Sequence, residues 1–106
     1  MNKEKVIEVK AVSETGELIA SFGRFEKDDI QRLIDVATKQ NMSCLSFINL
    51  PRNMYFNELQ ARDIKKEVFT LTKHKELSQN LLKSIEQAAD VADKEEAFVK
   101  FEVLQF

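Results

Sequence analysis

The chain contains one cysteine and one histidine, the residue types that most often serve as nucleophile and general base. A reactive thiolate requires an accessible, electropositive setting and a positioned partner. Cys44 lies in segment 43–49, which has the alternation of a strand, and a small buried side chain is the ordinary explanation there. His74 lies in a basic junction between Lys73 and Lys75. These residues therefore do not predict a catalytic pair.

The sequence also disfavours a metal site and acid–base catalysis. Four zinc ligands cannot be assembled from one Cys and one His without carboxylates at motif spacing. Paired acids do occur, but at expected helix ends and linkers, where solvent keeps both carboxyl groups ionised: Asp28/Asp29, Asp90/Asp93 and Glu95/Glu96. Neither glycine has a second glycine nearby, so no phosphate-binding loop is present in the sequence. We expect no enzymatic activity, no metal and no cofactor.

A basic segment offers a nucleic-acid hypothesis. Residues 51–75 carry six Lys or Arg against three acids, a local net charge of +3. Cations would contact phosphates and a nearby aromatic ring would stack on bases. The sequence pI of about 5.5 counts against a dedicated nucleic-acid binder. The alternative hypothesis is therefore a nucleic-acid-associated regulator with these contacts: Tyr55, Arg62, Lys65, Lys66, Lys73 and Lys75.

An acidic segment supports a second hypothesis, binding to a basic protein. Residues 76–106 carry seven acids against three lysines, a net charge of −4. Four of these acids gather where an expected helix meets the last strand: Asp90, Asp93, Glu95 and Glu96. Such a cluster can steer and hold a basic protein, including the phosphate-binding groove of a nuclease. A hydrated linker is the other explanation for the same residues.

Length and composition set the class of protein. The 106 residues suit one domain spanning 1–106, and 43% apolar with 32% charged residues is typical of a globular chain. No apolar run exceeds three residues, so we expect no membrane span. The single Cys44 cannot form an internal disulfide, and we expect a cytoplasmic location.

Hydrophobic periodicity predicts the elements that would position these residues. Alternation predicts strands at 4–12 and 17–22, joined by a turn into an antiparallel hairpin. Apolar residues three and four apart predict helices at 27–40 and 75–92. Alternation also predicts strands at 43–49 and 97–105, and the turn residues at 50–53 predict a short strand at 54–56.

Segment 57–73 fits two structures. Asn57 and Gln60 have the spacing of a helix capping box, and apolar residues recur at 61, 64, 68 and 71. Residues 68–72 are instead rich in strand formers. Good helix formers at the surface positions favour the helix.

Seven of the eight phenylalanines fall into two groups. Phe47, Phe69 and Phe101 fit the expected core faces. Others lie at element ends, where some would stay exposed: Phe22, Phe25, Phe98 and Phe106.

The resulting fold is an α+β single domain: an antiparallel sheet of about four strands with helices packed on one face, in the order β-β-α-β-(β)-α-α-β. The expected function is binding to another protein without catalysis. Its most concrete form is an inhibitor or immunity-type protein that neutralises a toxin or enzyme by direct binding, with a basic toxin or nuclease as partner.

Overall fold

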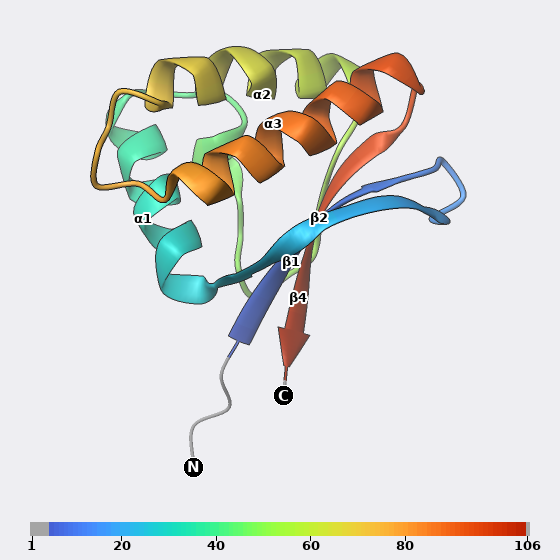
Figure 1. Cartoon of the computed structure of the whole chain (residues 1–106), viewed down its shortest axis with the longest axis horizontal. Helices are drawn as coiled ribbons and strands as arrows, with labels where there is room; N and C mark the ends of the chain where they lie inside the picture. The colour runs from blue at the N-terminus through green and yellow to red at the C-terminus, as the bar shows by residue number, and fades with distance from the viewer. Residues whose placement is uncertain (1–4, 106) are drawn as a thin grey trace.

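Four antiparallel strands form one sheet in which the last strand lies between the first and the third (Figure 1). The computed structural model describes residues 5–105, with side chains from 6 to 104. In spatial order the strands are β2 (Leu18–Glu26), β1 (Lys5–Val12), β4 (Phe98–Gln105) and β3 (Met54–Phe56). β4 pairs with β1 along its whole length, but with β3 only from Val99 to Phe101.

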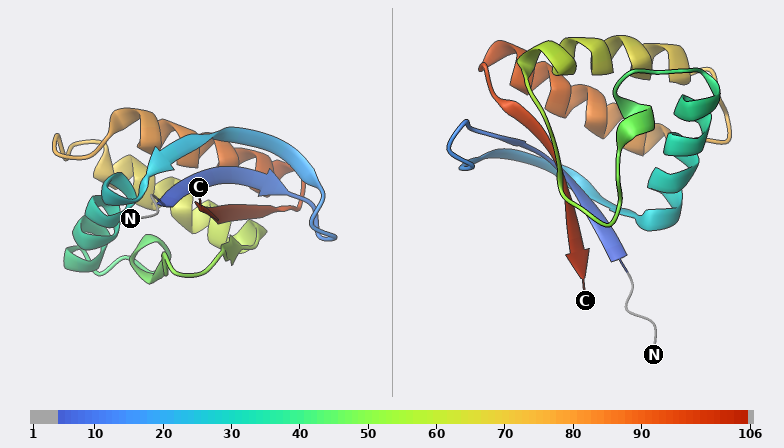
Figure 2. Two further views of the ribbon diagram at one scale, coloured as in Figure 1. Left: turned by 90° about the horizontal axis from the view of Figure 1, so that it is seen from below. Right: turned by 180° about the vertical axis from the view of Figure 1, so that it is seen from behind.

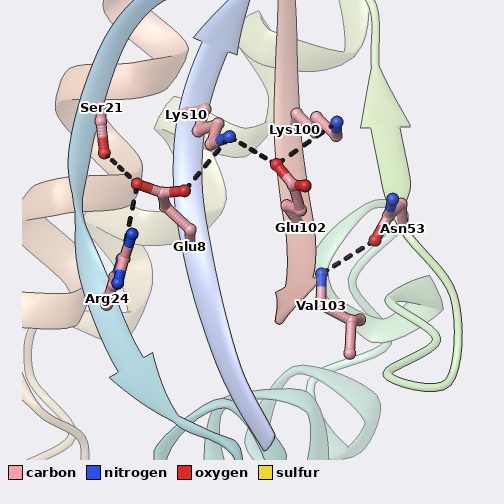
Figure 3. Close-up of polar contacts among 8 residues, drawn as sticks. All are labelled: Glu8, Lys10, Ser21, Arg24, Asn53, Lys100, Glu102 and Val103. Carbon is pink, nitrogen blue, oxygen red and sulfur yellow. Dashed lines mark hydrogen bonds and ion pairs between the residues drawn. The ribbon is translucent and has the colours of Figure 1, made fainter. Parts of the chain in front are cut away.

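Three helices cover one face of this sheet (Figure 2): α1 (Lys27–Lys39), α2 (Glu58–Leu71) and α3 (Gln79–Lys94). Ile7, Val9 and Phe101 point toward the helices and are almost fully buried. The alternate residues of β1 and β4 form the opposite face, which carries charged side chains (Figure 3). The α+β class, the element order and the one-sided packing are therefore confirmed.

The helix hypothesis for segment 57–73 is also confirmed. The Asn57 side chain accepts a hydrogen bond from the backbone N–H of Gln60, and the Gln60 side chain accepts one from the N–H of Asn57, both at 2.9 Å. This capping box satisfies donors at the first turn of α2. α3 begins later than residue 75, because the Ser78 hydroxyl accepts the N–H of Leu81 and makes Ser78 the N-cap.

The strand expected at 43–49 is wrong. Residues Leu45–Phe47 form a short 3-10 helix, η1, within a loop that links α1 to β3. The N–H groups of Cys44 and Leu45 donate to the buried carboxylate of Glu67 on α2, rather than to a neighbouring strand. Individual apolar residues of this loop are buried against the core between exposed ones. The sequence therefore alternates as it would in a strand, although no strand is formed.

Two of the three phenylalanines expected in the core are exposed. Phe101 is buried as expected, but the exposed fractions of Phe47 and Phe69 are 68% and 77%. Phe69 is out of phase with the buried positions 61, 64, 68 and 71 of its helix. Phe106 lies outside the described residues. The exposed rings are therefore not part of the core.

Candidate functional site

The predicted acidic and basic contact residues meet each other across two helices. Arg62 on α2 donates to Asp93 on α3, with Nε 2.6 Å from Oδ1. Lys65 Nζ lies 3.1 Å from Asp90 Oδ1 and 3.6 Å from Asp93 Oδ2. Asp90 also pairs with Lys94 at 3.0 Å. Two members of the predicted protein-binding cluster and two of the predicted nucleic-acid contacts are thus partners of one another.

These contacts favour the ionised forms of Arg62, Lys65, Asp90 and Asp93. The hydrogen bond from Arg62 lowers the pKa of Asp93, and the bonds from Lys94 and Lys65 lower that of Asp90. The same bonds raise the pKa of Arg62 and Lys65. Because the pairs lie at the surface, we expect a small contribution to stability. Their main effect is that these charges are compensated within the molecule.

The remaining predicted contact residues are dispersed. Glu95 and Glu96 are exposed after α3, and Lys66, Lys73 and Lys75 are exposed on and after α2; none of these five forms a salt bridge within residues 6–104. Tyr55 belongs to β3, and the Lys100 ammonium lies 5.3 Å from its ring centroid. Lys100 belongs to the charged face of the sheet, away from the helices (Figure 3). The structure therefore does not bring Tyr55 together with the cations of α2.

Cys44 has the environment of a structural thiol. It is 3% exposed, and its Sγ lies 3.8 Å from the backbone oxygen of Gln60. Burial, followed by the negative charge of Glu67, raises the pKa of the thiol to about 11. His74 lies after α2, where its Nδ1 is 3.8 Å from Glu76 Oε1 and its Nε2 has no hydrogen-bond partner among the described residues. Neither side chain bonds to the other.

The face of the sheet without helices carries a chain of ionised residues (Figure 3). Lys10 on β1 donates to Glu102 on β4 and lies 3.1 Å from Glu8. Lys100 lies 3.4 Å from Glu102, and the Ser21 hydroxyl donates to Glu8 at 2.7 Å. Arg24 on β2 also lies near Glu8, at 3.8 Å. The charges of four residues on two central strands are thus compensated locally.

The pKa shifts in this network keep its groups charged. Burial raises the pKa of Glu8, but hydrogen bonds from Ser21 and Lys10 outweigh it and the net shift is downward. The hydrogen bond between Lys10 and Glu102 raises the pKa of Lys10 and lowers that of Glu102. None of these shifts moves a group toward neutral pH, so the arrangement is suited to holding charge rather than to transferring protons.

The outward face of α2 carries a feature that the sequence analysis missed. Leu59, Arg62, Lys66 and Phe69 are spaced by three and four residues, so they share one helix face, which we call the α2 stripe. Its two apolar members, Leu59 and Phe69, are 61% and 77% exposed. The spacing of the buried residues in α2 would have excluded Phe69 from the core, and this signal was available in the sequence.

Comparison with known proteins yields no relative. No family model, curated protein or solved structure matches this chain. Over the described residues, no group of three or more His, Cys, Asp or Glu side chains is placed to hold a metal ion, and no helix is long and apolar enough to cross a membrane.

Proposed function

We propose that this chain acts by binding another protein and catalyses no reaction itself. The observation that carries the proposal is the exposure of Leu59 and Phe69 on the α2 stripe. Large apolar side chains outside the core are typical anchors of protein interfaces, particularly where charged residues surround them. Lys66 lies between the two on the same helix face and supplies such a charge.

In its most concrete form the protein is an inhibitor or immunity-type protein that covers the active site of a toxin or enzyme. Glu95 and Glu96 are the members of the acidic cluster that stay exposed, so they are the contacts available to a basic partner. Asp90 and Asp93 already have cationic partners within the molecule. We also propose a cytoplasmic location, which a free and buried Cys44 thiol supports.

A pull-down from the native host tests this function. The wild-type chain should retain one protein in near-equal amount, and Phe69→Glu should lose it. Phe47→Glu is the matched control, since Phe47 is also an exposed phenylalanine but lies in η1. Loss with Glu95→Gln/Glu96→Gln instead would place the contact at the end of α3. Retention by all of these variants, or no partner at all, would refute the proposal.

A nucleic-acid-associated regulator is the second candidate. It is favoured by one observation: Lys66 and Lys73 flank the exposed ring of Phe69 along the chain. A cationic helix face with an aromatic ring can bind a single strand through phosphate contacts and stacking. Titration with oligo(U) RNA at increasing salt tests it. Affinity that falls steeply with salt would support this candidate, and no binding at low salt would eliminate it.

A further inference from the structure

One face of α2 is exposed from the first turn of the helix to the last. Its residues recur at spacings of three and four, opposite the buried residues of the same helix: Leu59, Arg62, Asp63, Lys66, Phe69 and Thr70. Leu59 and Phe69 lie near the two ends of this face and are 61% and 77% exposed. The face therefore presents two large apolar side chains to solvent, with charged side chains between them.

Two of these charges have no counter-ion within the described chain. Arg62 is compensated by Asp93, but Asp63 and Lys66 form no salt bridge within residues 6–104. Asp63 and Lys66 both line a groove of about 420 Å³ beside the segment that follows α1, so they lie on the same side of α2. The face thus carries an uncompensated acid and an uncompensated base about one turn apart.

This order of charges is complementary to itself in one orientation. Two copies of α2 packed antiparallel, about a two-fold axis level with residues 64 and 65, bring Asp63 of each copy opposite Lys66 of the other. A parallel pair in register would instead bring Asp63 against Asp63 and Lys66 against Lys66. Because opposite charges attract across an interface and like charges repel, the antiparallel pair is favoured.

The apolar residues fit the same register. Leu59 of one copy lies level with Thr70 of the other, one residue away from Phe69. Each end of the helix pair would therefore cover one Leu59 and one Phe69 that are exposed in the single chain. The contact comes from one helix face per copy, so its area is at the low end for protein interfaces and we expect a weak dimer.

We propose that α2 pairs with α2 of a second copy of this chain in an antiparallel, two-fold dimer, held by reciprocal ion pairs between Asp63 and Lys66 and by contacts between Leu59 and Phe69. The dimer goes beyond the proposed function, because it concerns two identical chains. It also has a consequence for that function: a host protein anchored on Leu59 and Phe69 would compete with the second copy for the same face.

Sedimentation velocity of the purified chain, from about 10 μM to about 1 mM, tests the dimer. The wild type should pass from monomer to dimer over this range, and its association should weaken as salt rises. Asp63→Lys and Lys66→Asp should each weaken association at least about tenfold, because each places like charges opposite one another. Asp35→Lys and Lys39→Asp are the matched controls on the exposed face of α1 and should associate like the wild type.

Mixing the two charge variants tests the register itself. Asp63→Lys and Lys66→Asp should each remain monomeric alone but form a dimer when mixed, because every facing pair then combines an acid with a base. The double variant Asp63→Lys/Lys66→Asp should also associate, to within about threefold of the wild type. Circular dichroism checks that each variant is folded, as expected for changes at exposed positions.

Three outcomes would overturn the proposal: a wild type that stays monomeric up to about 1 mM, a dimer that neither single charge reversal weakens, or single variants whose association is restored neither by mixing nor in the double variant. The pull-down keeps the two proposals apart. A host partner retained by a chain that never dimerises would preserve the proposed function and refute the dimer. A dimer with this charge dependence but no host partner would do the reverse.

Discussion

Replacing Glu67 should release the loop that contains η1. Glu67 is 9% exposed, and its carboxylate accepts three hydrogen bonds: from the N–H of Leu45 at 2.9 Å, from the N–H of Cys44 at 3.1 Å and from the Ser43 hydroxyl at 3.3 Å. Glu67→Gln keeps the size of the side chain but replaces one acceptor oxygen with an NH₂ donor. That donor would face a backbone donor, so one buried N–H would lose its partner.

The expected loss in free energy of unfolding is about 2 to 3 kcal/mol, the usual cost of losing a buried hydrogen bond to a charged group. Urea unfolding followed by circular dichroism measures it. Glu95→Gln is the matched control, because Glu95 is exposed, and it should change the free energy of unfolding by less than about 0.5 kcal/mol.

Cys44 provides a second, local readout of the same change. Its thiol pKa is raised to about 11 by burial and then by the charge of Glu67. Removing that charge lowers the thiol pKa, and loosening the loop exposes the sulfur, so both effects accelerate reaction with a disulfide reagent at pH 8. An unchanged stability together with an unchanged Cys44 labelling rate in Glu67→Gln would refute this role of Glu67.

Three further perturbations have defined outcomes. The pKa values of Glu8 and Glu102 are lowered from 4.5, and that of Lys10 is raised from 10.5, so the stabilisation from these ion pairs is complete between pH 4.5 and pH 10.5. It is lost as the pH falls through the lowered carboxyl pKa values and as the pH rises through the raised pKa of Lys10. In urea unfolding, the stability difference between wild type and Lys10→Met should follow this pH dependence, and a pH-independent difference would contradict it. The N–H of Val103 donates to Asn53 Oδ1 at 2.8 Å, so Asn53→Ala should lower the free energy of unfolding by about 1 kcal/mol and speed hydrogen exchange at Val103. Asn53→Asp retains the acceptor and is the control; equal exchange in both variants would argue against this bond. His74→Phe should be neutral or stabilising by up to about 1 kcal/mol in thermal unfolding, because it removes a buried nitrogen without a partner in the described structure, and a clear loss would show that the nitrogen is satisfied.

Local patterns predicted most of the fold. The Asn57–Gln60 capping box and the buried spacing of α2 depend on residues within one or two turns, which a sequence displays directly. The 43–49 segment could not be predicted in this way, because Glu67, which fixes its backbone, lies 22 to 24 residues further along the chain. Tertiary contacts there override a strand-like alternation.

In the candidate site, too, the features set by local sequence could be predicted, and those set by contacts between distant residues could not. The acidic and basic sets were predicted as separate surfaces, since Arg62 and Asp93 are 31 residues apart and only the packing of α2 on α3 joins them. Their mutual neutralisation is a property of the folded helix pair. The exposure of Phe69, in contrast, follows from helix periodicity within α2 and was predictable from the sequence.

The position of β4 makes the sheet depend on residues from opposite ends of the chain. Within residues 5–105, the β1–β2 hairpin and the short β3 are connected in the sheet only through β4, and the first residue of β1 pairs with the last of β4, Lys5 with Gln105. During synthesis, therefore, the helices would emerge before the strand that completes the sheet beneath them. Before β4 has been synthesised, β3 lacks the only strand with which it pairs among the described residues. A backbone cut between α3 and β4 would thus separate one of the two central strands from the rest, and both fragments would have to associate to restore the sheet.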